Sequence, residues 1–326
     1  MRVIVLGGTR FIGRAVVDAL VAAGHEPLVC HRGTTEPADL PSVAHLHTER
    51  SQLSQSRDEL DAFAPDAVVD CLAMSPHDAR MLLTALPGAG LHRVVLSSQD
   101  VYRAFATVQC NGLATDAVPI DEDAPVRADR YPSREEPGFE EYSKLEVEDT
   151  VLAAGATILR LPMVFGPHDY QRREEFVLKR VRSGRSRIPV GAANALLPLA
   201  LVDDVARGVV AAVERGAKGP AIFNLAPAKT DPMAVWMQRI LAAAGSSAEL
   251  VRVPDGTALP ADMGLTAAFS QPLVISSAKA RHELGYRDTD ADVAVTRSVA
   301  WHLEHPPDSG SADFTLDDLA LAAISG

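Results

Sequence analysis

The sequence predicts an α/β protein with a doubly wound parallel sheet and a smaller C-terminal α/β unit. Over the first half, short apolar runs alternate with amphipathic stretches of about a dozen residues. A glycine-rich turn joins the first apolar run to the first amphipathic stretch. The 326 residues suffice for one large domain and one smaller domain.

The alternation sets the expected elements in order. Runs of Val, Ile, Leu and Ala read as buried parallel strands. The stretches between them carry apolar residues at helical spacing, and the first ends at Gly24, a common residue after a helix. We therefore expect strands at residues 3–6, 27–30, 43–47, 67–71 and 93–97, and helices at 11–23, 53–63 and 76–86.

The second half is less regular. Pro, Asp, Glu and Arg dominate residues 105–138, which predicts a long loop over a site. After Gly166 the alternation of apolar runs and amphipathic stretches becomes more irregular. We expect helices at 139–153, 174–183, 202–214, 232–244 and 277–284, and strands at 157–161 and 221–225 that return to the main sheet.

Composition argues against some classes of function. The formal net charge is −12, whereas nucleic-acid binding needs a basic face, so we expect no nucleic-acid partner. No apolar run is long enough to cross a bilayer and no signal-like segment precedes the first strand, so we expect a cytoplasmic protein without a membrane partner. Cys30, Cys71 and Cys110 are widely spaced and odd in number, which predicts reduced thiols.

The glycine-rich turn is the first candidate binding feature. It reads GGTRFIG over residues 7–13 and stands where a strand gives way to a helix. Free backbone N–H groups and the positive end of the helix bind phosphate at such a turn. Gly7 permits the tight turn and Gly13 permits close packing of helix on strand, so we expect a dinucleotide pyrophosphate here. Arg10 would either contact that pyrophosphate or project into solvent.

The end of the second strand indicates which dinucleotide binds. NAD-specific folds carry an Asp or Glu there, which accepts hydrogen bonds from the ribose hydroxyls. This chain has His31 and Arg32 instead, and a cation suits a 2′-phosphate. We therefore expect NADP(H) in preference to NAD(H), unless Arg32 is only a solvated turn residue. Glu49 and Arg50 would either line the adenine pocket or form a surface pair.

Several motifs together resemble one large enzyme family. They are GGTRFIG at 7–13, SSQDVY at 97–102, YSKLEVE at 142–148, LRLPMVFGP at 159–167, LVDDVARGV at 201–209, FNLA at 223–226 and ARHELGY at 280–286. On these segments the chain resembles the extended short-chain dehydrogenase/reductase superfamily, in its NAD-dependent epimerase/dehydratase branch. We accordingly expect a dinucleotide-binding Rossmann domain at 1–166, a mainly substrate-binding domain at 167–305, and a linker with a tail helix at 306–326.

The resemblance also implies the chemistry of the site. Members transfer hydride at a carbinol carbon; a Tyr is the acid/base, a Lys lowers its pKa and holds the nicotinamide ribose, and a Ser binds the substrate oxygen. The matching residues are Tyr142, Lys144 and Ser98, and Asp100 would be either a general base or a helix-terminal carboxylate. The expected cofactor residues are Gly7, Thr9, Arg10, Phe11, Ile12, Gly13, His31, Arg32, Glu49, Arg50, Leu72, Ala73, Met74, Ser97, Lys144, Pro162 and Val164.

The Tyr and the Lys depart from the family's Y-x-x-x-K spacing. Glu140 stands four residues before Lys144, where the family carries Tyr. Tyr142 is only two residues from Lys144, which places the two side chains about 200° apart on a regular helix. Either the helix starts irregularly and Tyr142 still reaches the site, or another group is the base.

These residues lead to one expected function and two alternatives. We expect an NADP(H)-dependent oxidoreductase or epimerase that acts on a small hydroxyl- or carbonyl-bearing molecule. A sugar nucleotide is among the candidate substrates. The expected assembly is a homodimer. The alternatives are a dinucleotide-binding regulatory protein without redox turnover, and a lyase or cyclase that uses bound cofactor without net redox. The basic stretch at 172–187 would hold an anionic substrate or form a solvated helix face, and the pairs His45/His47 and His302/His305 predict no metal site.

Overall fold

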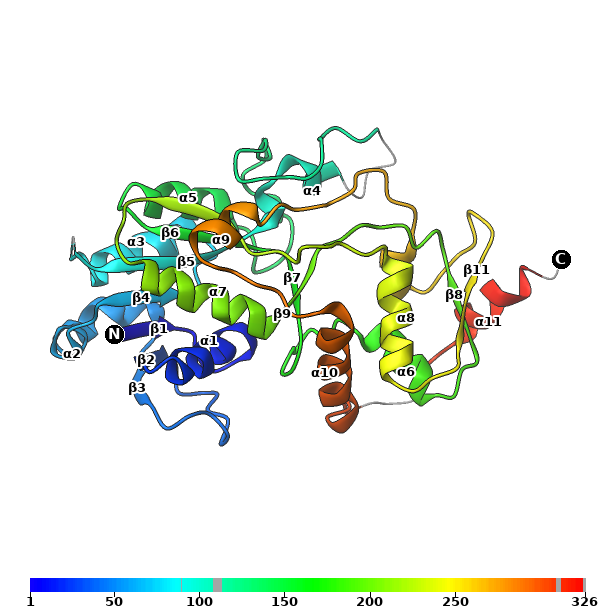
Figure 1. Ribbon diagram of the computed structural model, residues 1–326, viewed down its shortest axis with the longest axis horizontal. Helices are drawn as coiled ribbons and strands as arrows, with labels where there is room; N and C mark the ends of the chain where they lie inside the picture. The colour runs from blue at the N-terminus through cyan, green and yellow to red at the C-terminus, as the bar shows by residue number, and fades with distance from the viewer. Residues whose placement is uncertain (89, 108–112, 309–311, 325–326) are drawn as a thin grey trace.

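The computed structural model describes residues 1–88, 90–107, 113–308 and 312–324, and its centre is a seven-stranded parallel sheet (Figure 1). The strand order is β10-β6-β5-β4-β1-β2-β3, so the chain begins in the middle, winds to one edge, and crosses back to wind to the other. This order confirms the doubly wound sheet and the return of two late strands to it. The strands are β1 (Arg2–Leu6), β2 (Glu26–His31), β3 (Ala44–His47), β4 (Ala67–Asp70), β5 (His92–Ser98), β6 (Thr157–Leu161) and β10 (Ala221–Asn224).

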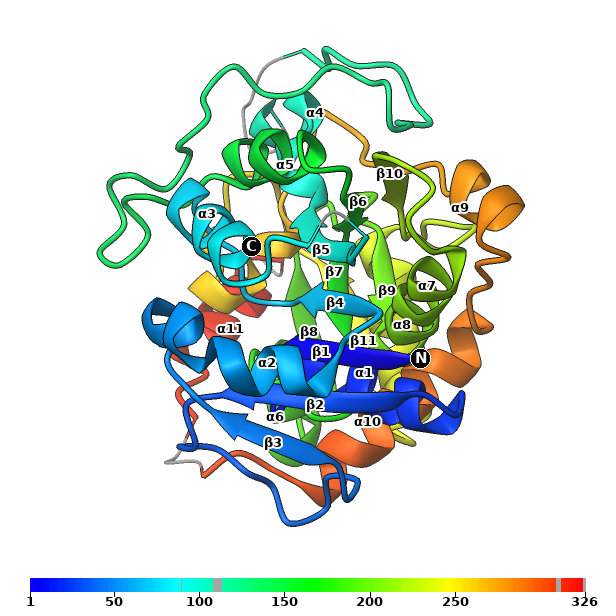
Figure 2. The same ribbon diagram turned by 90° about the vertical axis from the view of Figure 1, so that its left-hand side faces the viewer.

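Helices cover both faces of this sheet (Figure 2). Because side chains alternate along a strand, Val3 and Val5 belong to the core on one face, and Ile4 and Leu6 to the core on the other. One face is covered by α1 (Phe11–Ala22), α7 (Val202–Arg215) and α9 (Ala278–Glu283), and the other by η1 (Arg50–Ser56), α2 (Arg57–Phe63), α3 (Pro76–Ala85) and α5 (Lys144–Leu152).

The remaining elements gather on one side of the sheet, away from the N-terminus (Figure 1). Their core includes Trp236, which stacks on Phe176 and meets the edge of Phe165. Four short parallel strands there were not expected, because three or four residues give too little alternation to detect. The elements are β7 (Met163–Phe165), α6 (Glu175–Arg182), β8 (Arg187–Val190), β9 (Leu199–Leu201), α8 (Met233–Ala243), β11 (Glu249–Arg252), η3 (Ala261–Thr266), α10 (Ala291–Glu304) and α11 (Thr315–Ala322).

Two expectations about the segment before α5 are wrong. The segment expected to be loop from residue 105 opens instead with the end of α4 (Arg103–Thr107), a short helix that follows η2 (Gln99–Val101). The helix expected from residue 139 begins at Lys144, because the Ser143 hydroxyl accepts a hydrogen bond from the Glu146 N–H at 3.3 Å and caps the helix. Tyr142 therefore precedes the helix, and the 200° separation does not apply. Cys110 and residues 309–311 of the expected linker lie outside the described residues.

The basic stretch on and around α6 is mostly paired with carboxylates of the same chain, so it is not a solvated helix face. Arg180 is fully buried and forms two hydrogen bonds to Asp317 on the tail helix α11, at 2.6 and 3.0 Å. Arg180 also contacts Asp262, as does Lys179. These pairs dock the tail helix onto its own chain. In the described ranges, no helix is long and apolar enough to cross a membrane.

The tail helix provides a test of this docking. Asp317→Ala leaves the buried Arg180 without its main partner. We therefore expect the free energy of local opening of α11, measured by hydrogen exchange of its amides, to fall by about 3 kcal/mol. The matched control is Asp318→Ala on the same helix, whose carboxylate is mostly exposed. That change should cost less than about 1 kcal/mol. Equal effects of the two substitutions on amide exchange would contradict the buried pair as the anchor.

Candidate active site

The glycine-rich turn brings the start of α1 against the end of β1. Gly7 has a φ of +86°, in the left-handed region that favours glycine. A Cβ added to Gly13 would lie 1.8 Å from the Gly7 carbonyl oxygen, so only glycine allows this close approach. The first N–H groups of α1 are left free of side-chain caps, since Arg10 at the N-cap makes no such hydrogen bond. The turn therefore fits an anionic group at the helix terminus.

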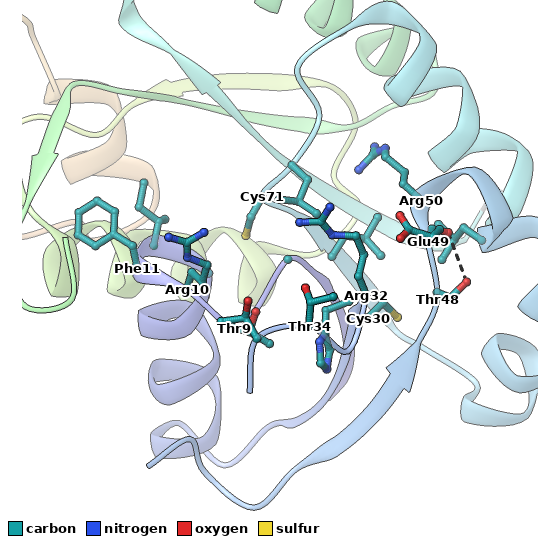
Figure 3. A pocket seen from close by; sticks show the side chains of 18 of the residues that line it. Thr9, Arg10, Phe11, Cys30, Arg32, Thr34, Thr48, Glu49, Arg50 and Cys71 are labelled. Carbon is teal, nitrogen blue, oxygen red and sulfur yellow. Dashed lines mark hydrogen bonds between the residues drawn. The ribbon is translucent and has the colours of Figure 1, made fainter. Parts of the chain in front are cut away.

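A cavity of about 500 Å³ opens over this turn (Figure 3). Its walls come from the ends of β1 and β2 and from the segments that follow β2, β3 and β4. Sequence reasoning missed several lining residues, since they lie in connecting segments without a motif: Thr34, Thr35, Thr48, Cys71 and Tyr170 among them. The expected residues that line it are Gly7, Thr9, Arg10, Phe11, Ile12, Gly13, His31, Arg32, Glu49, Arg50 and Leu72.

The three arginines of the cavity differ in their partners. Arg50 pairs with the buried Asp70, with N–O distances of 3.0 and 2.5 Å, and with Asp78 at 3.2 Å. Arg10 lies over the ring of Tyr170, 4.7 Å from its centroid. Arg32 is exposed at the cavity wall, and none of the described residues forms an ion pair or hydrogen bond with its side chain. Among the described residues neither Arg32 nor Arg10 has a carboxylate partner, so both charges are available to a ligand, whereas that of Arg50 is neutralised.

His31, beside Arg32, is buried at the end of β2. Burial first, and then the neighbouring His45 and His47, lowers the pKa of His31. Its ring is therefore neutral near pH 7 and does not add a second cation to Arg32.

A second group of expected residues meets past the end of β5. The Tyr142 hydroxyl donates a hydrogen bond to Asp100 Oδ2 at 2.6 Å, and the Ser98 hydroxyl accepts one from the Asp100 N–H at 3.2 Å. Burial first, and then the charge and hydrogen bond of Asp100, raises the pKa of Tyr142 far above its usual value. Tyr142 therefore keeps its proton, and the negative charge of the pair lies on Asp100.

Lys144 opens α5 and points its ammonium into the fold. Its Nζ donates hydrogen bonds to the carbonyl oxygens of Ala73 at 2.6 Å and Leu96 at 3.1 Å. Burial lowers the pKa of Lys144, while the charges of Asp70 and Asp100 oppose that shift. Lys144 thus lies between the carboxyl ends of β4 and β5, near both halves of the site.

The other expected cofactor residues lie around Lys144 and along β6 and β7. The Met74 carbonyl accepts a hydrogen bond from the Ser143 N–H at 2.9 Å, next to the Ala73 carbonyl that Lys144 contacts. Ser97 donates its hydroxyl proton to Glu148 at 2.6 Å, so this side chain is held within the protein. Pro162 joins β6 to β7, and Val164 lies buried in β7.

One residue near this group was missed by sequence reasoning. The charge of Arg127 lowers the pKa of Tyr142, opposing burial and Asp100. Its backbone N–H donates to the Val101 carbonyl at 2.8 Å, which ties the long segment after α4 to η2. No motif marks Arg127; only its place in the segment expected to cover a site could have suggested it.

Comparisons with known proteins identify the family of the chain. The model of the NAD-dependent epimerase/dehydratase family matches residues 3–226. Chloroplast stem-loop binding protein of 41 kDa b from Arabidopsis thaliana is 26% identical, over 98% of this chain and 84% of its own. The 2-alkyl-3-oxoalkanoate reductase of Stenotrophomonas maltophilia is 28% identical, over 76% of each chain.

A solved structure shows the same fold. The UDP-glucose-4-epimerase from Stenotrophomonas maltophila, crystallised with bound NAD and formylated UDP-arabinopyranose, matches with a TM-score of 0.72 and 17% identity. The match covers 95% of this chain and 100% of that one. The sequence motifs, the glycine turn at the end of β1 and the family match over residues 3–226 lead to one conclusion. The chain belongs to the NAD-dependent epimerase/dehydratase family and is a nicotinamide-dependent enzyme of the extended oxidoreductase or epimerase type.

Proposed function

We propose that the protein uses NADP(H) to interconvert a hydroxyl and a carbonyl group on a small molecule. The hydrogen bond from Tyr142 to Asp100 carries this proposal. A base for alcohol oxidation must be deprotonated near neutral pH, and the raised pKa of Tyr142 excludes its phenolate from that role. Asp100, as the charged member of the pair, is the terminal proton acceptor, and Tyr142 is the relay.

The proton steps follow from this geometry. In oxidation, the substrate hydroxyl proton passes to the Tyr142 oxygen as the proton of Tyr142 passes to Asp100 Oδ2. In reduction, the same two transfers run in reverse and protonate the carbonyl oxygen. Ser98, beside the pair, binds the substrate oxygen. When bound, the nicotinamide ring supplies the hydride acceptor or donor.

The residues of the first cavity fit the rest of the cofactor. The glycine turn at 7–13 would hold the pyrophosphate. Arg32, which has no partner among the described residues, would bind the 2′-phosphate. An ammonium has three N–H donors and Lys144 uses two on backbone carbonyls, so the third can bind a ribose hydroxyl. Leu72, Ala73, Met74, Pro162 and Val164 would border the nicotinamide end.

Two observations bear on the substrate. A curated relative that aligns over 76% of this chain is a reductase, which supports carbonyl chemistry rather than elimination or binding alone. Residues 167–305 would supply most of the substrate contacts, and Arg127 would add a cation from the long segment after α4. We propose a small polar substrate, with sugar nucleotides among the candidates to screen.

The central test is turnover. Purified protein incubated with NADP⁺ or NADPH and a panel of small alcohols, ketones and sugar nucleotides should change the absorbance at 340 nm with at least one of them. Tight NADP(H) binding without any absorbance change across the panel would favour a regulatory protein instead.

Asp100→Asn tests the relay. We expect kcat for oxidation near neutral pH to fall about hundredfold or more, because the terminal acceptor is gone. The substitution also removes the charge and the hydrogen bond to carboxylate that raise the pKa of Tyr142, so that pKa falls. The phenolate then forms at lower pH than in the wild type, but burial still holds that pKa above its usual value, so the phenolate accepts the proton only in alkaline solution. Oxidation by Asp100→Asn should therefore recover as the pH rises, as followed by initial rates at 340 nm.

Two further variants make that result specific. The double variant Asp100→Asn/Tyr142→Phe should show no alkaline recovery, because it lacks the phenol. Glu140→Gln is the matched control, since Glu140 is an exposed carboxylate two residues before Tyr142. It should keep its rate within about twofold. An unchanged kcat in Asp100→Asn would overturn the role of Asp100.

Arg32→Ala tests the choice of cofactor. Loss of one charge-assisted contact should raise the Kd for NADP⁺ about tenfold to hundredfold and leave the Kd for NAD⁺ nearly unchanged. Isothermal titration of both dinucleotides measures this difference. Arg10→Ala is the control, because a group near the pyrophosphate should affect both dinucleotides alike. If Arg32→Ala raised the Kd values for NADP⁺ and NAD⁺ equally, Arg32 would contact a group that both cofactors contain, and not the 2′-phosphate.

A further inference from the structure

Three imidazoles and a carboxylate meet at the outer edge of the sheet, beside the cavity. In the parallel pairing of β2 with β3, His31 is in register with His47. His45 lies two residues earlier on β3, so its side chain emerges on the same face as that of His47. Glu36 reaches the same point from the segment after β2. The candidate ligand atoms of these four residues all lie within 4.8 Å of one another.

The contacts converge on one oxygen. Glu36 Oε1 lies 3.1 Å from His31 Nε2 and 3.7 Å from His45 Nδ1, and it contacts His47 Nε2 directly. His31 Nε2 is 2.9 Å from His45 Nδ1. In a tetrahedral zinc site with bonds of 2.0–2.1 Å, adjacent ligand atoms are roughly 3.3 Å apart. The observed separations lie on both sides of that value, so small side-chain shifts would complete the site.

We propose that His31, His45, His47 and Glu36 bind one divalent transition-metal ion, with Zn²⁺ as the best match. Three imidazole nitrogens and one carboxylate oxygen form a donor set that suits Zn²⁺ and not Mg²⁺ or Ca²⁺, which take oxygen ligands. The sequence pattern showed only His45 and His47, two residues apart on one strand. Folding adds His31 through strand register and Glu36 through the segment after β2, and together they make four ligands.

One hydrogen bond must change when the metal binds. The Gly33 N–H now donates to His31 Nδ1 at 3.1 Å. A neutral imidazole that binds metal through Nε2 carries its proton on Nδ1, where it can no longer accept that bond. Gly33 must therefore turn away, which its exposed position and the wide backbone freedom of glycine allow. Metal binding should move the Gly33 amide.

The ion would tie the segment after β2 to the sheet. That segment carries Arg32 and Thr34 on the cavity wall as well as Glu36. His31 and His47 are fixed by β2 and β3, so a metal bond to Glu36 would hold the segment against them. This structural role does not require that the proposed redox activity exist.

The experiment uses full-length protein without a histidine tag, stripped with a chelator. Isothermal titration with Zn²⁺ should give one site per chain with a Kd below about 1 µM, and Co²⁺ loading should give the visible absorption of a four-coordinate ion. The variant His45→Gln/His47→Gln should bind Zn²⁺ at least about a hundredfold more weakly, since two of the four ligands are gone. His77→Gln, which removes an exposed histidine outside the cluster, should bind as the wild type does.

Two readouts separate this site from other surface binding. An ¹⁵N spectrum should show the Gly33 amide shift on addition of Zn²⁺ to wild type but not to His45→Gln/His47→Gln, whose retained circular dichroism confirms that it is folded. Absence of stoichiometric Zn²⁺ binding would overturn the proposal. So would equal affinity in wild type and the double variant. Neither result depends on turnover, so the metal site can fail while the proposed function stands, or the reverse.

Discussion

The close packing of α1 on the end of β1 is the constraint on which the cofactor site depends. A Cβ on Gly13 would lie 1.8 Å from the Gly7 carbonyl oxygen, so the helix can approach the strand only with glycine there. Strand register then places the rest. Leu6 pairs with Cys30 on β2 and with Asp70 on β4, so the residues that follow those strands come to the same edge of the sheet. The glycine turn, Arg32 and Leu72 are neighbours for this reason.

A chain of polar contacts links that edge to the proposed reacting groups. Asp70 is fully buried and accepts hydrogen bonds from Arg50 and from the N–H groups of Leu72 and Ala73, which fixes the turn after β4. The Ala73 carbonyl then receives Lys144 at the start of α5. A buried charge must be paired to persist, so removing either Arg50 or Asp70 would disturb the turn that positions Lys144. One network of hydrogen bonds and ion pairs thus reaches from the cavity at the glycine turn to Lys144.

The sequence was sufficient for the sheet, most helices and the glycine turn, because these follow from local periodicity and from backbone needs. The start of α5 could also have been placed. Ser143 and Glu146 form the S-x-x-E pattern that marks a helix start, and the Ser143 side chain does cap this helix. The pairing of Arg180 with Asp317 could not be foreseen, since the partners are 137 residues apart. The same holds for the meeting of Glu36 and His31 with the two histidines of β3, which depends on strand register.

The distribution of positive charge differs between the cavity and the basic stretch on α6. A relative of this chain is named for binding a stem-loop. Nucleic-acid binding needs a row of free cations along a surface, whereas Arg180 and its neighbours on α6 are paired with acidic residues of this chain. The net charge of −12 adds a further repulsion of polyanions. Arg10 and Arg32 instead line a partly open cavity of about 500 Å³, where their charges would suit the phosphates of one dinucleotide. The charges around the cavity are therefore those that the proposed dinucleotide site requires.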